Sequence, residues 1–92
     1  MLLISYDISN TKLRTQFSKF IKKHGRRLQF SVYEIKNSER ILNIILLEIE
    51  NNFAKRFEIT DSILIVPVCE WCSKKIIRYG YAVHEEEEIV FM

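Results

Sequence analysis

The amino-acid sequence predicts a small α+β domain, and three observations lead to this prediction. The chain has 92 residues, enough for one domain only, which we assign to residues 1–92. Hydrophobic residues make up 48% of it, so it can fill a packed core. Short apolar runs alternate with segments of helical periodicity in the order strand, helix, strand or strands, helix, strand, strand. That order is typical of a sheet covered by helices on one face.

The first strand and the first helix are predicted from adjoining segments. The apolar run at residues 2–6 predicts a strand buried at the middle of a sheet, and Asp7 closes it. Ser9 or Asn10 can cap the helix that follows, in which apolar residues recur at helical spacing. We expect Gly25 to end this helix in a left-handed conformation.

The middle of the chain predicts further sheet segments and a second helix. Residues 26–36 alternate over much of their length, which indicates one strand or two short ones separated by a kink. Asn37 and Ser38 can cap a helix whose apolar stripe runs from Leu42 to Phe57. Residues 63–66 predict the next strand, and residues 74–79 are expected to be its hairpin partner.

The chain ends in an apolar run at residues 88–92, which predicts a final strand. Left unpaired it would be an aggregation hazard, so it should pair with a sheet edge of its own chain or of a partner. The complete order matches a ferredoxin-like split β-α-β sandwich. The sheet face without helices needs a cover, and a second copy of the chain is the simplest one. We therefore expect a homodimer.

Charge is distributed unevenly along the chain. Residues 1–36 hold eight Lys and Arg against two acids, a net charge of +6, whereas residues 37–92 carry −4. A basic half of this kind can bind a polyanion. The candidate nucleic-acid-binding residues are Lys12, Arg14, Lys19, Lys22, Lys23, Arg26 and Arg27. Solvated lysines on a helix surface are the alternative interpretation.

Other features narrow the possible roles. The chain shows no signal peptide and no run near the roughly 18 apolar residues of a membrane span, so we expect a cytoplasmic protein without a membrane partner. Cys69 and Cys72 form one Cys-x-x-Cys, which is half a zinc site. Structural thiols are the favoured interpretation, and a redox role or a metal shared between copies stays open.

Three segments together resemble a known family: YDIS at residues 6–9, GRRLQFSVYE at residues 25–34, and DSI at residues 61–63 leading into CEWC at residues 69–72. They are similar to the small CRISPR-associated adaptation protein that partners the CRISPR integrase in spacer acquisition. Members of that family are described as metal-dependent endoribonucleases. The likeness runs over most of the chain in the correct order.

The resemblance implies a homodimer of ferredoxin-like protomers whose sheets face each other, with the C-terminal strand added to the partner's sheet. It implies that Asp7 stands near the dimer axis and, with its copy, holds one Mg²⁺ or Mn²⁺ per dimer as the catalytic and metal-binding acid. Tyr6 and Tyr33 match supporting positions, as do Arg14 and Arg27. Gln16 departs from the second arginine of some members.

Two functions follow from the resemblance and stay open here. In the first, the dimer bridges integrase dimers and holds incoming double-stranded DNA. In the second, it is a stand-alone, toxin-like metal-dependent endoribonuclease that cleaves single-stranded RNA through Asp7, with a DNA endonuclease as a variant. Whether the protein is an enzyme is left undecided. For Asp7 itself, a helix cap or a local turn is the competing interpretation.

Overall fold

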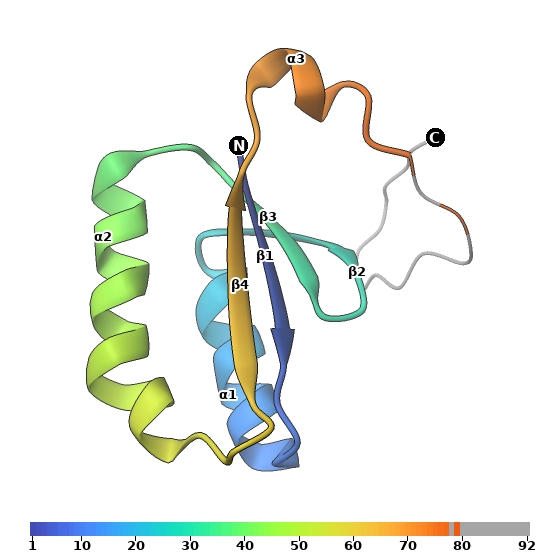
Figure 1. Ribbon diagram of the computed structural model, residues 1–92. Coiled ribbons are helices and arrows are strands. Elements are labelled where there is room, and N and C mark those ends of the chain that lie inside the picture. Colours follow the sequence, from blue (N-terminus) through green and yellow to red (C-terminus); the bar gives the residue numbers. More distant parts are fainter. Residues whose placement is uncertain (78, 80–92) are drawn as a thin grey trace.

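The computed structural model describes residues 1–77 and 79, in which a four-stranded antiparallel sheet is covered by helices on one face (Figure 1). The elements are β1 (Leu2–Asp7), α1 (Thr11–Lys22), β2 (Gly25–Gln29), β3 (Val32–Ile35), α2 (Glu39–Glu48), β4 (Ser62–Pro67) and α3 (Glu70–Ser73). Two helical turns, η1 (Ile49–Phe53) and η2 (Ala54–Arg56), continue α2. The sheet order β2-β3-β1-β4 is that of a split β-α-β unit, so the predicted ferredoxin-like fold is confirmed. The strand expected at residues 88–92 lies outside the described residues.

The central strand β1 places alternate side chains on opposite faces of the sheet. Leu2, Ile4 and Tyr6 are buried under the helices, whereas Asp7 is exposed. β1 pairs with β3 on one side and with β4 on the other. A strand paired on both sides is the middle strand that its apolar run predicted.

Aromatic and aliphatic side chains of both helices fill the core between the helices and the sheet. Leu13, Phe17 and Ile21 of α1 are buried, as their helical spacing predicts. Phe53 of η1 meets Phe17 edge to face, with ring centroids 5.1 Å apart. Ile45 is the fully covered residue of α2. This shared core fixes both helices to one sheet face.

Residues 25–35 form a β-hairpin, the two-strand form of the prediction for this region. The turn lies at Phe30 and Ser31, where Ser31 has a φ of 74° and Phe30 is 67% exposed. A register shift between Arg27 and Gln29 marks a β-bulge in the hairpin. The main chain of Tyr6 in β1 donates to the Ser31 carbonyl at 3.1 Å, which ties the turn to the central strand.

Gly25 does not end α1 in a left-handed conformation, and that expectation was wrong. The cap of α1 is Lys23, with a φ of −67°, and Gly25 opens β2 with a φ outside the left-handed region. Glycine is needed there because β3 passes very close. A Cβ on Gly25 would lie 2.0 Å from the Glu34 carbonyl oxygen and 2.5 Å from Ile35 Cδ1.

Gly25→Ala should therefore destabilise the fold by about 1–3 kcal/mol, the usual cost of inserting a methyl group into filled space. Urea denaturation followed by circular dichroism measures the change. The control is Lys23→Ala, at an exposed position two residues earlier, which should stay within about 0.5 kcal/mol of the parent. An unchanged denaturation midpoint for Gly25→Ala would mean that β3 does not approach so closely.

The strand expected at residues 74–79 is not formed in its described part, residues 74–77 and 79. The chain instead turns into the short helix α3, where the Ser73 amide donates to the Cys69 carbonyl at 2.8 Å and the Lys75 amide to the Cys72 carbonyl at 3.0 Å. Within the expected strand, the main-chain amide of Lys75 is thus taken by a local bond. None of the helices in the described part of the chain has the length and apolarity of a membrane span.

Candidate functional site

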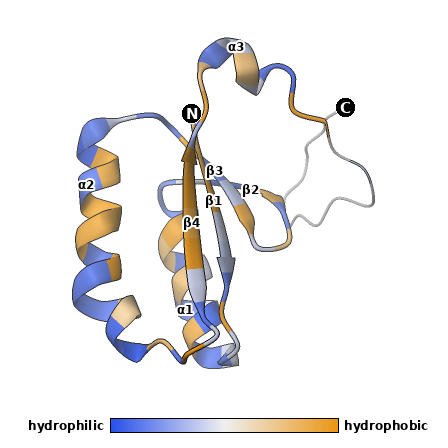
Figure 2. Cartoon of the chain, in the orientation of Figure 1, coloured by the Kyte–Doolittle hydropathy of each residue, from blue (hydrophilic) through white to orange (hydrophobic). Residues whose placement is uncertain are grey.

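Asp7 lies on the sheet face that the helices leave uncovered, which we call the open face. In the β1–β4 register Asp7 is opposite Ser62, Ser5 is opposite Leu64 and Leu3 is opposite Val66, so these side chains share that face. Leu64 is 62% exposed and Val66 38%. Figure 2 shows that β4 is hydrophobic over most of its length. The open face thus combines apolar surface on β4 with the Asp7 carboxylate at the end of β1.

The Asp7 carboxylate has no hydrogen bond or ion pair with any other residue that the structure describes. Asp7 does not cap the first helix, because Asn10 does so by accepting from the Leu13 amide at 2.9 Å. No structural task within the described chain therefore accounts for an acid at this position.

The loop that follows Asp7 is held from two sides. Arg14 Nη1 of α1 donates to the Ile8 carbonyl at 3.0 Å. Asp61, just before β4, accepts from the Ser9 amide at 3.0 Å and from the Glu58 amide at 2.9 Å. The Glu58 amide and then the Ser9 amide hold the pKa of Asp61 below its usual range. Asp61 thus stabilises the loop after β1 through its hydrogen bonds, and these contacts hold the end of β1, where Asp7 lies, in place.

Asp7 supplies part of the ligand set that a divalent cation needs. Among the described residues, no three His, Cys, Asp or Glu side chains gather as a ready metal site. Mg²⁺, however, is commonly held by one or two carboxylates and several waters. An exposed carboxylate on an uncovered face supplies one such ligand, and a second protomer facing it would supply another. A metal here would therefore need the dimer.

The exposed side of α1 is basic. Lys12, Lys19 and Lys22 are exposed on it, and Lys23 follows at its C-terminal cap. No acid occurs between Thr11 and Lys23, so this helix surface has no negative charge of its own. The opposite side of α1 faces the core.

The three candidate arginines are each anchored by specific partners. Arg14 holds the loop after β1, as described above. Arg26 forms an ion pair with Glu34 on the neighbouring strand, with Nε and Oε1 3.4 Å apart. Arg27 donates from Nη2 to the Tyr33 hydroxyl at 2.9 Å, and its guanidinium lies 5.4 Å from the centroid of that ring. Arg14 and Arg27 are thus held by hydrogen bonds within the protomer, whereas Arg26 forms a surface ion pair.

Tyr6 and Tyr33 lie beneath the sheet, on the face opposite to Asp7. Tyr33 is fully buried and its hydroxyl lies 2.6 Å from Ser18 Oγ of α1. The two tyrosine rings stack with centroids 6.2 Å apart. Burial raises the pKa of the Tyr6 hydroxyl. Both tyrosines therefore support the strand and Arg27 from inside.

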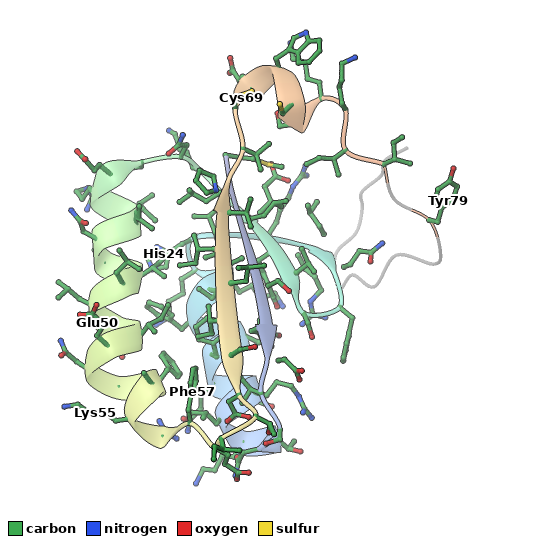
Figure 3. The ribbon with its side chains drawn as sticks, in the orientation of Figure 1. His24, Glu50, Lys55, Phe57, Cys69 and Tyr79 are labelled. Atoms are coloured by element: carbon green, nitrogen blue, oxygen red, sulfur yellow. The ribbon has the colours of Figure 1, made fainter. Side chains whose placement is uncertain are left out.

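Arg56 is a basic residue beside the α1 surface that the sequence reasoning missed. Its Nη2 donates to Gln16 Oε1 of α1 at 2.6 Å, and its Nη1 to Asn52 Oδ1 at 3.1 Å. Lys55 is its exposed neighbour, and its side chain points away from the body of the protein (Figure 3). In the sequence, only the i, i+4 spacing of Asn52 and Arg56 could have indicated that the Arg56 side chain is held against its own helix. The basic surface of α1 thus continues onto η2.

The chain matches a known protein family over most of its length. The family model described as CRISPR associated protein Cas2 matches residues 1–76. The chain belongs to the Cas2 family.

Two Cas2 relatives carry the name CRISPR-associated endoribonuclease. The Methanospirillum hungatei protein Cas2 2 is 29% identical over 97% of this chain and 96% of its own length. The Rhodospirillum rubrum protein Cas2 4 is 30% identical over 90% of this chain, which spans 64% of that protein. The fold is similar to the crystal structure of a hypothetical protein, TT1823, from Thermus thermophilus. There the TM-score is 0.67, with 23% identity over 89% of this chain and 92% of that one.

In this Cas2 chain most of the predicted site residues lie in three separate places. Asp7 and Arg26 lie on the open face, since Asp7 shares it with Leu64 and Arg26 pairs with Glu34 there. Tyr6, Tyr33 and Arg27 lie on the side of the helices. The lysines of α1 lie on its outer side, away from the sheet. One protomer therefore does not bring the acid and the lysines together.

Proposed function

We propose that this chain is the adaptation subunit of a CRISPR system, a homodimer that holds incoming duplex DNA and bridges two integrase dimers. The observation that carries this proposal is the acid-free, lysine-rich outer side of α1, continued by Lys55 and Arg56. Phosphate contacts by lysine position a duplex without reading its sequence, which suits a subunit that accepts unrelated DNA fragments.

The open face supports the dimer in this proposal. Leu64 and Val66 expose apolar side chains on a sheet surface that no described helix covers. A second copy placed on it by two-fold symmetry would bury both surfaces together. The arrangement also leaves the outer sides of both α1 helices free for DNA.

Mixing the purified chain with the integrase encoded beside it tests the bridging role. We expect light scattering after size exclusion to find two integrase dimers for each dimer of this chain, with duplex DNA retained in the complex. Elution of the two proteins as separate species, with and without DNA, would contradict the proposal.

Leu64→Glu should convert the dimer into a folded monomer. Leu64 is already largely exposed in the protomer, so a charge there costs little in the monomer but becomes buried at the interface. Sedimentation measures the mass, and circular dichroism checks the fold. Leu47→Glu on the outer side of α2 is the matched control, because Leu47 is 59% exposed yet lies away from the open face. If Leu64→Glu stays dimeric, the open face is not the interface.

The second candidate function is a Mg²⁺- or Mn²⁺-dependent endonuclease acting on single-stranded RNA or on DNA. The free carboxylate of Asp7 favours it, since this acid has no structural partner in the described chain. Asp7 of both protomers would hold the ion, which supplies Lewis-acid chemistry to a phosphodiester. The name endoribonuclease of both relatives supports the same activity class.

A further inference from the structure

Cys69 and Cys72 lie together at the start of α3, and neither packs in the core. Both thiols are exposed, so the interpretation as structural thiols stays a prediction, and the redox role that the sequence left open can be argued beside it. Cys69 is the N-cap of α3, and the Cys72 amide donates to Cys69 Sγ at 3.3 Å. Figure 3 places Cys69 where β4 passes into α3, at the end of the sheet away from the α1–η2 side.

We propose that Cys69 and Cys72 form a reversible redox pair, in which Cys69 attacks a small-molecule disulfide such as glutathione disulfide and Cys72 resolves the product. The geometry supports the two roles. The main chain of Cys72 is bonded to the Cys69 sulfur, so the second cysteine is held next to the first. A Cys-x-x-Cys of this arrangement in a reducing compartment is typical of thiol–disulfide chemistry.

The two thiols also differ electronically, as the two roles require. Hydrogen bonds from the amide and then the thiol of Cys72 lower the pKa of Cys69. The same thiol contact and the negative charge of Cys69 raise the pKa of Cys72. The thiolate is the attacking form, so Cys69 is the nucleophile and Cys72 keeps its proton until the second step.

Cys69 has a space in which a small disulfide can be bound. It lines a cavity of about 770 Å³ together with residues that include His24, Arg26, Lys36 and Glu70, and Cys72 does not line it. Of the two cysteines, Cys69 is thus the one that borders this cavity.

The chemistry balances without a further reactant. Cys69 thiolate attacks one sulfur of the small disulfide, whose S–S bond breaks, and the departing thiolate takes up the proton that Cys69 had lost. The Cys72 thiol then gives up its proton, attacks Cys69 Sγ and releases the second small thiol, which takes that proton. Two protein thiols become one disulfide, and one small disulfide becomes two thiols.

The experiment treats the full chain with glutathione disulfide, quenches it by alkylation and weighs it by mass spectrometry. We expect the parent to lose two hydrogens without a lasting adduct. Cys72→Ser should trap one glutathione, and Cys69→Ser should react at least about tenfold more slowly. Trp71, the single tryptophan of the chain, lies between the two cysteines, so its fluorescence should change with disulfide formation in the parent alone.

Three outcomes would overturn the redox pair. They are a parent that keeps both thiols free, equal trapping by the two serine variants, and co-purified zinc with thiols that react only after chelation. The last outcome would identify the pair as half of a metal site shared between copies. The parent measurement needs no substitution, so poor folding of a variant does not remove the test. Loss of DNA binding bears on the proposed function and not on this result.

Discussion

Lys19→Glu with Lys23→Glu should weaken duplex DNA binding by at least about tenfold at ~150 mM salt, equally for unrelated sequences. Both lysines are exposed and lie one helical turn apart, on the side of α1 away from the buried Phe17 and Ile21. Each phosphate contact releases counterions, so log affinity falls with log salt by about 0.9 per phosphate neutralised. The variant should lose part of that slope as well as affinity.

Fluorescence anisotropy at several salt concentrations measures both quantities. Lys36→Glu with Lys74→Glu is the matched control, since both positions are exposed, lie off α1 and carry the same change of charge. It should retain most of the affinity and the parent slope. A double variant in α1 that binds as tightly as the parent would mean that this helix surface is merely solvated. Equal losses in both double variants would point to net charge alone.

Asp7→Asn should abolish metal-dependent cleavage, with a loss of at least about 100-fold. Even changes in the outer shell of a metal site cost about 10- to 100-fold, and loss of a direct ligand should cost no less. Cleavage of labelled RNA and DNA is measured with Mg²⁺, with Mn²⁺ and with EDTA. The dimer should persist in this variant, because two carboxylates near one axis repel each other and the amides do not.

Glu50→Gln is the control, an exposed carboxylate on η1 with the same loss of charge. It should cleave like the parent. Cleavage by Asp7→Ala that is undiminished and resistant to EDTA would place the activity elsewhere or in a contaminant. If the parent cleaves nothing but Asp7→Asn still binds DNA and integrase, Asp7 serves the scaffold and not a reaction.

Much of the fold could be predicted because apolar spacing decides it. Leu13, Phe17 and Ile21 recur at helical intervals and are buried, and residues 2–6 read as a middle strand and are one. The predictions for Gly25 and for residues 74–79 failed because individual backbone contacts, which no periodic pattern reveals, decide the structure there. Gly25 is required by the close approach of the Glu34 carbonyl on another strand, and the Lys75 amide bonds to the Cys72 carbonyl of α3.

The candidate site was harder to predict because it depends on which face each residue occupies. Sequence spacing placed Asp7 and Tyr6 side by side, but strand alternation sends one to the open face and the other into the core. The bond from Arg56 to Gln16 joins residues 40 positions apart, so no local pattern could show it. The exposed state of Cys69 and Cys72 likewise depends on where β4 ends.

The alternation in β1 has a consequence for how this chain can diverge. Its inward residues, such as Ile4 and Tyr6, are packed in the core, so substitutions there destabilise the fold. The outward residue Asp7 is exposed and has no hydrogen bond or ion pair with another described residue, so it can change while the fold survives. The inward and outward positions of this six-residue strand can therefore be substituted independently of each other. A variant can lose Asp7 or gain a new outward group without a compensating change in the core.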